Sequence, residues 1–210
     1  NVTGNVTPFD TFTVNHTGSD ADGYQGNIVI DDGSVIRTIT FTGLEPINAG
    51  DATTIIFNLT GGADDATLAD ATGGKFTLAV PGMAETTTMS YPAANGSLTI
   101  NMGAGNDRLT VTNTLLFNPN TDLIIDGQAD SDTVRLNAAG GFTVTDALSI
   151  TAETIDQTGR VTVSGTTALD AGAAGSITLT SAANDFGGAV TVTNGTAVTL
   201  VDANSMSVAS

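Results

Sequence analysis

The chain has 210 residues, with 22 acidic and five basic side chains, one histidine and no cysteine, and its formal net charge at pH 7 is −17. The lack of cysteine excludes disulfides and thiolate metal sites, and a single histidine, His16, excludes most histidine-based catalytic and zinc sites. The charge argues against nucleic-acid partners, which require clustered Lys and Arg, whereas it would attract divalent cations.

Two further properties bound the class of protein. Apolar residues make up 40% of the chain and alternate with polar ones, which is not typical of disorder. No apolar run approaches the roughly 18 residues of a membrane-spanning helix, so we expect no membrane insertion. The first residues, NVTGNVTPFDTF, contain no initiator Met and no secretion signal, which favours a segment of a longer protein.

The first 33 residues hold two short alternating stretches, FDTFTV and GNIVID, around a loop at 18–26. Asp20 and Asp22 in this loop resemble the start of an EF-hand calcium loop, D-x-D-x-D-G, although the third acid and the distant Glu are missing. They are therefore a candidate calcium pair, with an Asx-rich turn as the simpler interpretation. His16, just before the loop, is expected to be solvated.

Strict alternation of apolar residues with Thr, Asn or Asp runs through most of the remaining chain and predicts β-strands. The stretches end in Gly, Asn or Asp, which are typical of turns, and cover residues 34–44, 53–61, 74–80, 97–103, 121–127 and 159–165. The best candidate helix, 147–158, is rich in β-branched residues and lacks a 3.6-residue period. We therefore predict an all-β fold.

The first part of the chain is less regular than the second. Residues 79–96 interrupt the alternation and contain two of the five prolines. We expect residues 1–96 to form an irregular β region, either irregular solenoid rungs or a small sandwich, and residues 97–210 to form regular rungs.

An internal repeat predicts the architecture of residues 97–210. A shift of 25 residues aligns Leu98 with Leu123 and Leu148, and it aligns further similar residues: Ile100 with Ile125 and Ile150, Leu109 with Val134, Val111 with Leu136, Phe117 with Phe142, Asp107 with Asp132 and Arg135 with Arg160. Further on, SITLTSAAN (176–184) recurs as AVTLVDAN (197–204) after about 20 to 21 residues. Strand-only repeats of this length are typical of a parallel β-helix or β-solenoid, whose rungs stack to bury a shared core.

Several stretches carry a resemblance to known proteins. TITFTGLEPI (38–47), TIIFNLTGGADDATL (54–68) and GSLTINMGAGNDRLTV (96–111) resemble units of very large exported bacterial proteins built of β-strand repeats. Residues 175–209 are similar to β-helical adhesins of the filamentous-haemagglutinin type. The resemblance covers most of residues 35–209 and implies an exported surface or matrix protein with an adhesive or scaffolding role.

Three acidic turns, 61–67, 103–108 and 126–133, follow strands in similar positions and are the main candidate metal sites. The second lies in NMGAGNDRLTV, which resembles one calcium-binding nonapeptide of bacterial repeat toxins, but no second Gly-Asp turn follows nine residues later. Calcium could instead bridge stacked turns, and the candidate ligands are Asp64, Asp65, Asp107, Asp130 and Asp132. The alternative is that Gly and Asp simply form the corners of a solenoid.

We expect no catalytic site. The arginines that follow the repeat are expected to pair with nearby aspartates rather than to act on a substrate: Arg108, Arg135 and Arg160 with Asp107, Asp132 and Asp156. A carboxylate pair such as Asp130 and Asp132, at the spacing of an inverting hydrolase, arises by chance in an acidic solenoid.

The sequence thus predicts a non-catalytic segment of a long exported protein, a stiff β rod used in adhesion or in a fibre, sheath or surface layer. Its expected partners are further repeats of the same chain or identical subunits stacking into a fibre, with surface glycans as a further candidate. Calcium is the one candidate cofactor. The alternative function is a calcium-dependent carbohydrate-binding module of a secreted protein.

Overall fold

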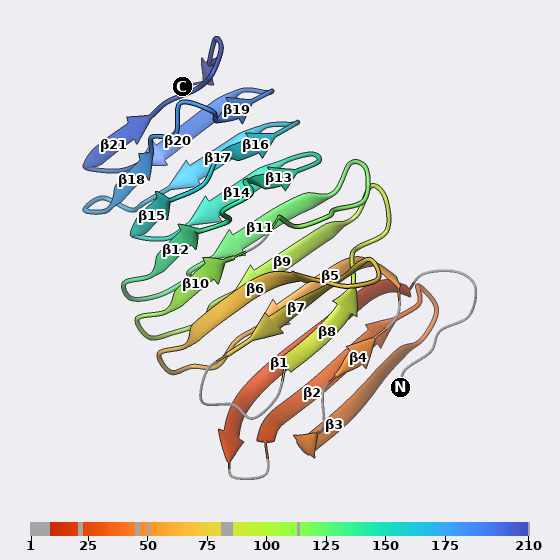
Figure 1. The fold of residues 1–210 in the computed structure, drawn as a ribbon. Coiled ribbons are helices and arrows are strands. Elements are labelled where there is room, and N and C mark those ends of the chain that lie inside the picture. The colour runs from red at the N-terminus through yellow and green to blue at the C-terminus, as the bar shows by residue number, and fades with distance from the viewer. Residues whose placement is uncertain are drawn as a thin grey trace.

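The computed structural model describes residues 9–20, 23–44, 47–49, 51–80, 86–112 and 114–209. Within these residues the chain forms 22 β-strands and no helix (Figure 1), as the alternation predicts. Residues 147–158, the best candidate helix, form two strands instead. The described part of the chain contains no helix long and apolar enough to cross a membrane.

The strands form three sheets. Sheet I has the order β22-β20-β17-β14-β11-β9-β5-β1-β2-β3 and sheet II the order β21-β18-β15-β12-β10-β6-β7-β8-β4. Sheet III has the order β13-β16-β19. The strands of sheet I are β1 (Phe9–Asp20), β2 (Gly23–Asp31), β3 (Ile36–Leu44), β5 (Ala52–Asn58), β9 (Ser97–Asn101), β11 (Asp122–Asp126), β14 (Leu148–Thr151), β17 (Thr167–Asp170), β20 (Val190–Asn194) and β22 (Val208–Ala209). Those of sheet II are β4 (Asn48–Ala49), β6 (Asp65–Ala71), β7 (Lys75–Ala79), β8 (Thr86–Ser90), β10 (Arg108–Val111), β12 (Thr133–Leu136), β15 (Thr154–Gln157), β18 (Ser176–Leu179) and β21 (Ala197–Leu200). Sheet III contains β13 (Phe142–Val144), β16 (Val161–Val163) and β19 (Asp185–Phe186).

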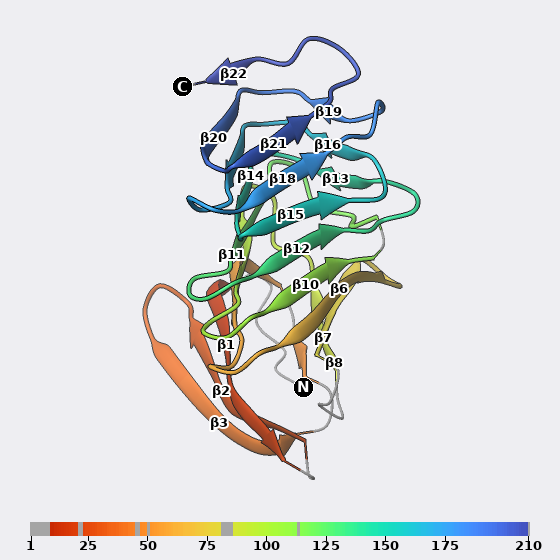
Figure 2. The same cartoon turned by 90° about the vertical axis from the view of Figure 1, so that its left-hand side faces the viewer.

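From β9 onward the chain is a parallel β-solenoid. It passes from sheet I to sheet II and, from β13 on, through sheet III before it returns to sheet I one rung higher, so that each strand pairs in parallel with its counterpart in the next rung (Figure 2). The predicted 25-residue register is confirmed for β9, β11 and β14, because Leu98, Leu123 and Leu148 are aligned across these three strands. The predicted parallel β-solenoid is therefore the fold of the second part of the chain, over the described residues 97–112 and 114–209.

The alternation explains why these segments are strands. In a strand, successive side chains point to opposite faces, and strands such as β9, β11 and β12 alternate buried with half-buried or exposed residues. The buried positions are mostly Leu, Ile, Val and Phe, and they form one continuous core through the described rungs. Each rung covers the apolar face of the next, which a single rung could not do alone.

The first part of the chain is an irregular start of the same solenoid, not a separate sandwich. Strand β5 pairs in parallel with β9, and β6 pairs in parallel with β10, so both sheets run across residue 96. The spacing here is 43 residues, from Thr54 to Ser97, because the antiparallel strands β7 and β8 are inserted after β6. Sheet I is extended in a similar way by the antiparallel strands β2 and β3.

The spacing of later rungs varies more than the sequence predicts. In sheet II it falls from 25 residues, between Arg108 and Thr133, to 21 residues, between Thr133 and Thr154. The corner before the sheet II strand shortens at this point from six residues, 127–132, to two, 152–153. Arg135 therefore lies beside Asp156, and its predicted alignment with Arg160 is wrong.

The outer face of sheet I carries a ladder of asparagine side chains. Nδ2 of Asn101 donates to Oδ1 of Asn58 (2.6 Å), Nδ2 of Asn58 donates to Oδ1 of Asn15 (2.5 Å), and Nδ2 of Asn15 donates to Oδ1 of Asn27 (2.8 Å). All three hydrogen bonds run in one direction along the solenoid. They link β9, β5, β1 and β2, so the polar surface reinforces the same stacking as the core.

His16 is buried, contrary to the expectation of a solvated side chain. It is 4% exposed, and its ring centroid lies 6.5 Å from that of Phe57. His16 follows the inward positions Phe12 and Val14 of β1, and this alternation places it in the core. Burial lowers the pKa of His16 to about 4, so the side chain is neutral at pH 7.

We predict that the stacked inward positions dominate stability. Leu123 is fully buried between Leu98 and Leu148, and Leu123→Ala leaves a cavity that should cost about 3 kcal/mol of the free energy of unfolding. The control, Ile124→Ala, truncates the next side chain on the half-buried outer face and should cost about 1 kcal/mol or less. Urea unfolding measures both, and equal losses would contradict the inward assignment.

Candidate functional site

The acidic turns of the sequence meet at one corner of the solenoid, between the ends of sheet I strands and the starts of sheet II strands. Asp64, Asp107 and Asp132 each stand directly before a sheet II strand, and Glu153 takes this position one rung further on. The strand register stacks these positions from rung to rung. We call these four residues the acid ladder.

Each carboxylate of the acid ladder after the first accepts a hydrogen bond from the backbone of the acid before it, and that of Asp64 accepts from the N–H of Thr60 (2.9 Å). The N–H of Asp64 donates to Oδ1 of Asp107 (2.6 Å), and the N–H of Asp107 donates to Oδ1 of Asp132 (2.9 Å). The N–H of Asp132 donates to Oε2 of Glu153 (2.8 Å). The carboxylates thereby satisfy corner amides that have no strand partner, which explains why acids recur at this position.

The backbone of the corner is shaped by glycine and by stacked turns. Gly105 has a φ of 109°, and a Cβ at this position would lie 2.7 Å from the backbone nitrogen of Ala63 in the preceding rung. The N–H of Gly105 donates to Oδ2 of Asp130 (3.0 Å), and the N–H of Ser131 donates to Oδ1 of Asn106 (3.1 Å). The turn GAGND (103–107) therefore stacks on QADSD (128–132) with the predicted spacing of 25 residues.

Electrostatics make Asp107 the unusual member of the acid ladder. Burial raises its pKa to about 6, the hydrogen bond from Asp64 opposes this, and the charges of Asp132, Asp64 and Asp130 add to it. Asp107 is 2% exposed, and its Oδ2 atom has no hydrogen-bond partner in the part of the chain that the structure describes. This oxygen is free to take up a proton as the pH falls.

The pKa of Asp132 is also raised, chiefly by burial and against the hydrogen bond from Asp107. The charges of Glu153, Asp130 and Asp126 add to this shift. Asp107 and Asp132 therefore favour protonation more than isolated surface carboxylates would.

The candidate calcium ligands are only partly brought together. Asp64, Asp107 and Asp132 stack, and Asp130 accepts a hydrogen bond from the N–H of Gly105 in the neighbouring turn. Asp65 instead accepts hydrogen bonds from Arg108, including one from Nε (2.9 Å). Asp20 ends β1, far from the corner in sequence, and Asp22 lies outside the described residues.

Within the described ranges, no group of three or more His, Asp or Glu side chains is arranged to hold a metal ion. The carboxylates of the acid ladder point at backbone amides rather than toward a common centre. Calcium binding thus stays a prediction, and the geometry of this corner does not support it.

Both arginine pairs that the structure specifies differ from the expected order. Arg135 donates to both carboxylate oxygens of Asp156 rather than to Asp132, with Nη2 at 2.8 Å from Oδ2. Arg108 pairs with Asp65 of the preceding rung rather than with Asp107, because Asp107 is turned inward and buried. Both pairs lie on the surface, across neighbouring strands of sheet II.

The sequence interpretation missed two polar residues that hold rungs together. Glu153 is one, and its signal was its place directly before a strand. Asn184, which is fully buried, is the other: its Nδ2 donates to the carbonyl oxygens of Leu179 and Val201, and its Oδ1 accepts from the N–H of Val161 (2.8 Å). Its signal was the recurrence of SAAN at 181–184 as DAN at 202–204.

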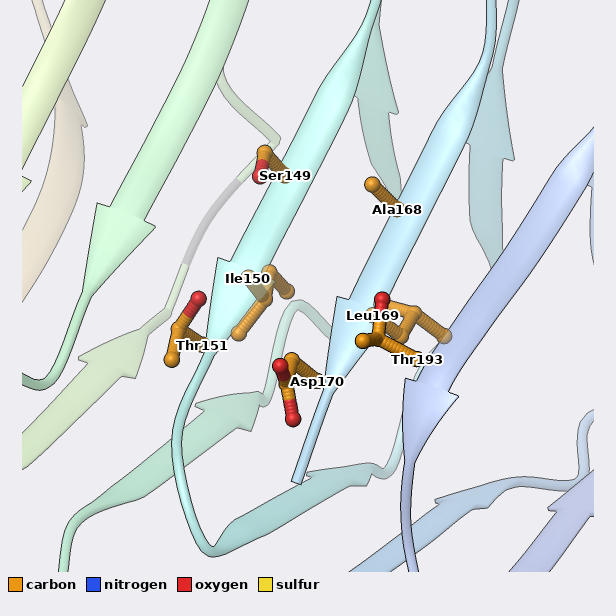
Figure 3. A pocket seen from close by; sticks show the side chains of 7 residues that line it. All are labelled: Ser149, Ile150, Thr151, Ala168, Leu169, Asp170 and Thr193. Atoms are coloured by element: carbon orange, nitrogen blue, oxygen red, sulfur yellow. The ribbon is translucent and has the colours of Figure 1, made fainter. Parts of the chain in front are cut away.

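A hollow of about 140 Å³ opens on the outer face of sheet I (Figure 3). It lies across β14, β17 and the neighbouring β20, where the short side chain of Ala168 leaves room, and is lined by Ser149, Ile150, Thr151, Ala168, Leu169, Asp170 and Thr193. Three hydroxyl groups and one carboxylate face it, and Oδ1 of Asp170 also accepts from the N–H of Gly172 (2.9 Å). The hollow can offer hydrogen bonds to a small polar molecule, and its lining contains no aromatic platform.

We predict that Asp107 couples stability to pH. Its pKa is about 6 in the folded chain and about 3.9 when unfolded, so the folded state binds the proton more tightly. Its contribution to the free energy of unfolding therefore rises by about 2 kcal/mol as the pH falls from 7.5 to 4.

The variant Asp107→Asn should lose this pH-dependent contribution to the free energy of unfolding. Its stability relative to the natural chain should be highest at pH 7.5 and should decline by about 2 kcal/mol toward pH 4, as measured by urea unfolding. His16, with its lowered pKa, destabilises the fold on acidification, but it does so in both chains and cancels in the difference. Parallel stability curves for the two chains would contradict the assignment.

Comparison with known proteins supports the repeat architecture. A family model described as "Repeats of unknown function (DUF5649)" matches residues 127–193, which run from the corner before β12 to β20. Neither the curated proteins nor the solved structures contain a match. The matched repeats and the stacked parallel strands agree, and the chain is a repeat protein.

Proposed function

We propose that this chain is a structural segment of a long exported surface or matrix protein, and that its function is mechanical. The observation that carries the proposal is the continuity of the rung-to-rung ladders. One hydrophobic core runs through the described rungs, and ladders of Asn and of acidic side chains add polar links between them. Such a stack resists bending and extension because every rung is bonded to its neighbours.

The export part of the proposal is supported by composition and resemblance. The chain has no cysteine, so its stability does not depend on the redox state of the compartment. Its surface is acidic and rich in Thr, Asn and Ser, and its sequence resembles exported bacterial strand-repeat proteins. An adhesive or layer-forming role follows from the same resemblance.

The alternative, a calcium-dependent glycan-binding module, has less support. The hollow on sheet I offers hydroxyl groups and the single carboxylate of Asp170, but its lining contains no aromatic side chain on which a sugar could stack. It contains no second carboxylate to share a calcium ion with Asp170.

The mechanical proposal is tested by pulling the chain between two marker domains in a force spectrometer. We expect stepwise extension to about 700 Å for the whole chain, at forces above those that unfold a helical marker domain, because adjacent strands must be separated in turn. The Leu123→Ala chain is the matched control and should yield at lower force. Extension in one event, before the marker unfolds, would contradict a mechanical role.

The export proposal is tested on intact cells of the source organism. Antibodies raised against the 210-residue chain should label unpermeabilised cells or their surrounding matrix, and mild external proteolysis should remove the label. An abundant cytosolic protein serves as the control for lysis. Labelling that appears only after permeabilisation would overturn the proposal.

A further inference from the structure

The polarity of the edge strands makes the two ends of the solenoid compatible with each other. Strand β1 runs parallel to β5 and so to the rest of sheet I, β2 reverses, and β3 reverses again (Figure 1). Two reversals leave β3 pointing in the same direction as β20 and β22 at the opposite edge. The β3 edge of one copy can therefore pair in parallel with the β22 edge of a second copy that is translated along the solenoid axis.

Sheet II repeats this arrangement. Strands β7 and β8 are successively antiparallel, and β4 is parallel to β8, so β4 points in the same direction as β6. The opposite edge of sheet II is β21, which is parallel to β18. One translation along the solenoid axis therefore matches the strand direction at the edges of both sheets at once.

The edges are open in the described part of the chain and carry apolar side chains. There, β3 pairs only with β2, and β22 pairs only with β20. At the β3 edge, Ile36 is 68% and Ile39 is 41% exposed, and at the other end Val208 is 63% exposed. Unpaired strand edges with exposed β-branched residues are templates for pairing with another chain.

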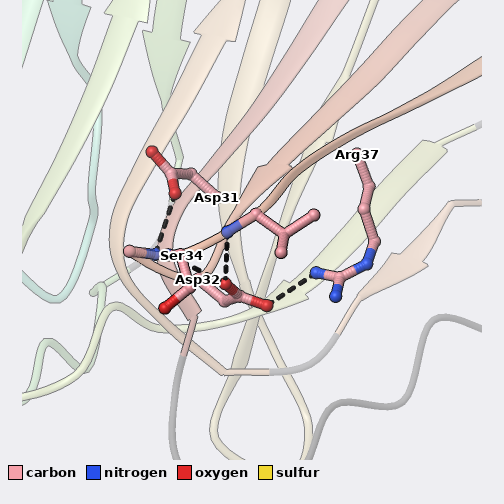
Figure 4. A network of polar contacts seen from close by, with 6 residues as sticks. Asp31, Asp32, Ser34 and Arg37 are labelled. Carbon is pink, nitrogen blue, oxygen red and sulfur yellow. Dashed lines mark hydrogen bonds and ion pairs between the residues drawn. The ribbon is translucent and has the colours of Figure 1, made fainter.

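The two ends are also the parts of this acidic chain where copies repel each other least. Residues 33–44 contain no acidic residue, and residues 190–209 contain only Asp202. At the turn before β3, the side chain of Asp32 is neutralised by Arg37, whose Nη1 lies 2.6 Å from Oδ2 (Figure 4). The remaining acid of this turn, Asp31, accepts a hydrogen bond from the N–H of Gly33 (2.8 Å).

We propose that the β3 edge of one copy pairs in parallel with the β22 edge of a second copy, so that sheet I continues from chain to chain. The contact is heterologous, and because stacking does not close on itself it generates a filament. The inference rests on the proposed structural function and specifies its partner, a second copy of this chain, and the surfaces that meet.

The test compares edge variants with a control of equal charge in the 210-residue chain. Thr38→Glu with Thr40→Glu places two charges on exposed positions of β3, and Thr166→Glu with Thr178→Glu places two on exposed positions away from that edge. Sedimentation velocity and electron microscopy should show rods that lengthen with concentration for the natural chain and the control. The β3 variant should associate about tenfold more weakly, because the two new carboxylates must lose water against an edge that offers them no Lys or Arg.

A mixing experiment establishes which edges meet. Val208→Glu alone should weaken assembly as the β3 variant does, and a mixture of Val208→Glu chains with Thr38→Lys/Thr40→Lys chains should assemble again. Unfolding midpoints equal to that of the natural chain confirm that each variant is folded. A chain that stays monomeric at every concentration would overturn the proposal, and so would a silent Val208→Glu, which indicates symmetric β3–β3 pairing. Association in solution does not depend on cellular location, so a negative result on intact cells would overturn the exported role without touching this contact.

Discussion

Hydrogen bonding and packing between consecutive rungs is the interaction on which this structure depends. No rung has a core of its own, so each apolar face is buried only by its neighbour. This requirement selects like residues at equivalent positions, as with Leu98, Leu123 and Leu148. It also demands a partner for every amide at the corners, where strand pairing stops. The carboxylates of the acid ladder meet that demand.

Placing the carboxylates of the acid ladder at this corner has an electrostatic cost. Stacking acids at the spacing of neighbouring strands, about 4.8 Å, brings like charges together in a partly dry environment. The amide bonds offset this cost for most of the acid ladder, but Oδ2 of Asp107 has no such bond in the described part of the chain. His16, in the core of the same solenoid, has the opposite effect. As the pH falls, the raised pKa of Asp107 increases the free energy of unfolding, whereas the lowered pKa of His16 decreases it.

The sequence predicts the features that are local or strictly periodic. The all-β fold, the inward Leu and Ile positions and the stacking of 103–107 on 128–132 follow from alternation and from the 25-residue spacing. It does not reveal where the period changes, because a corner shortened to residues 152–153 alters register without altering alternation. The membership of β5 and β6 in the solenoid was hidden for a similar reason, since an inserted hairpin lengthens the repeat to 43 residues. Glu153 escaped notice because its longer side chain replaces Asp at the shortened corner.

The asparagine ladder has a chemical consequence. Asn15 and Asn58 both stand in Asn-x-Thr sequences, the acceptor pattern for N-linked sugars, and the atom that would carry the sugar is Nδ2. In the folded chain each of these nitrogen atoms donates to the next amide, so a sugar that replaces one of its two hydrogen atoms would crowd the ladder between β1 and β5 or between β1 and β2. Folding and glycosylation therefore compete for the same two nitrogen atoms, and whichever comes first determines whether this face carries the asparagine ladder or attached sugars.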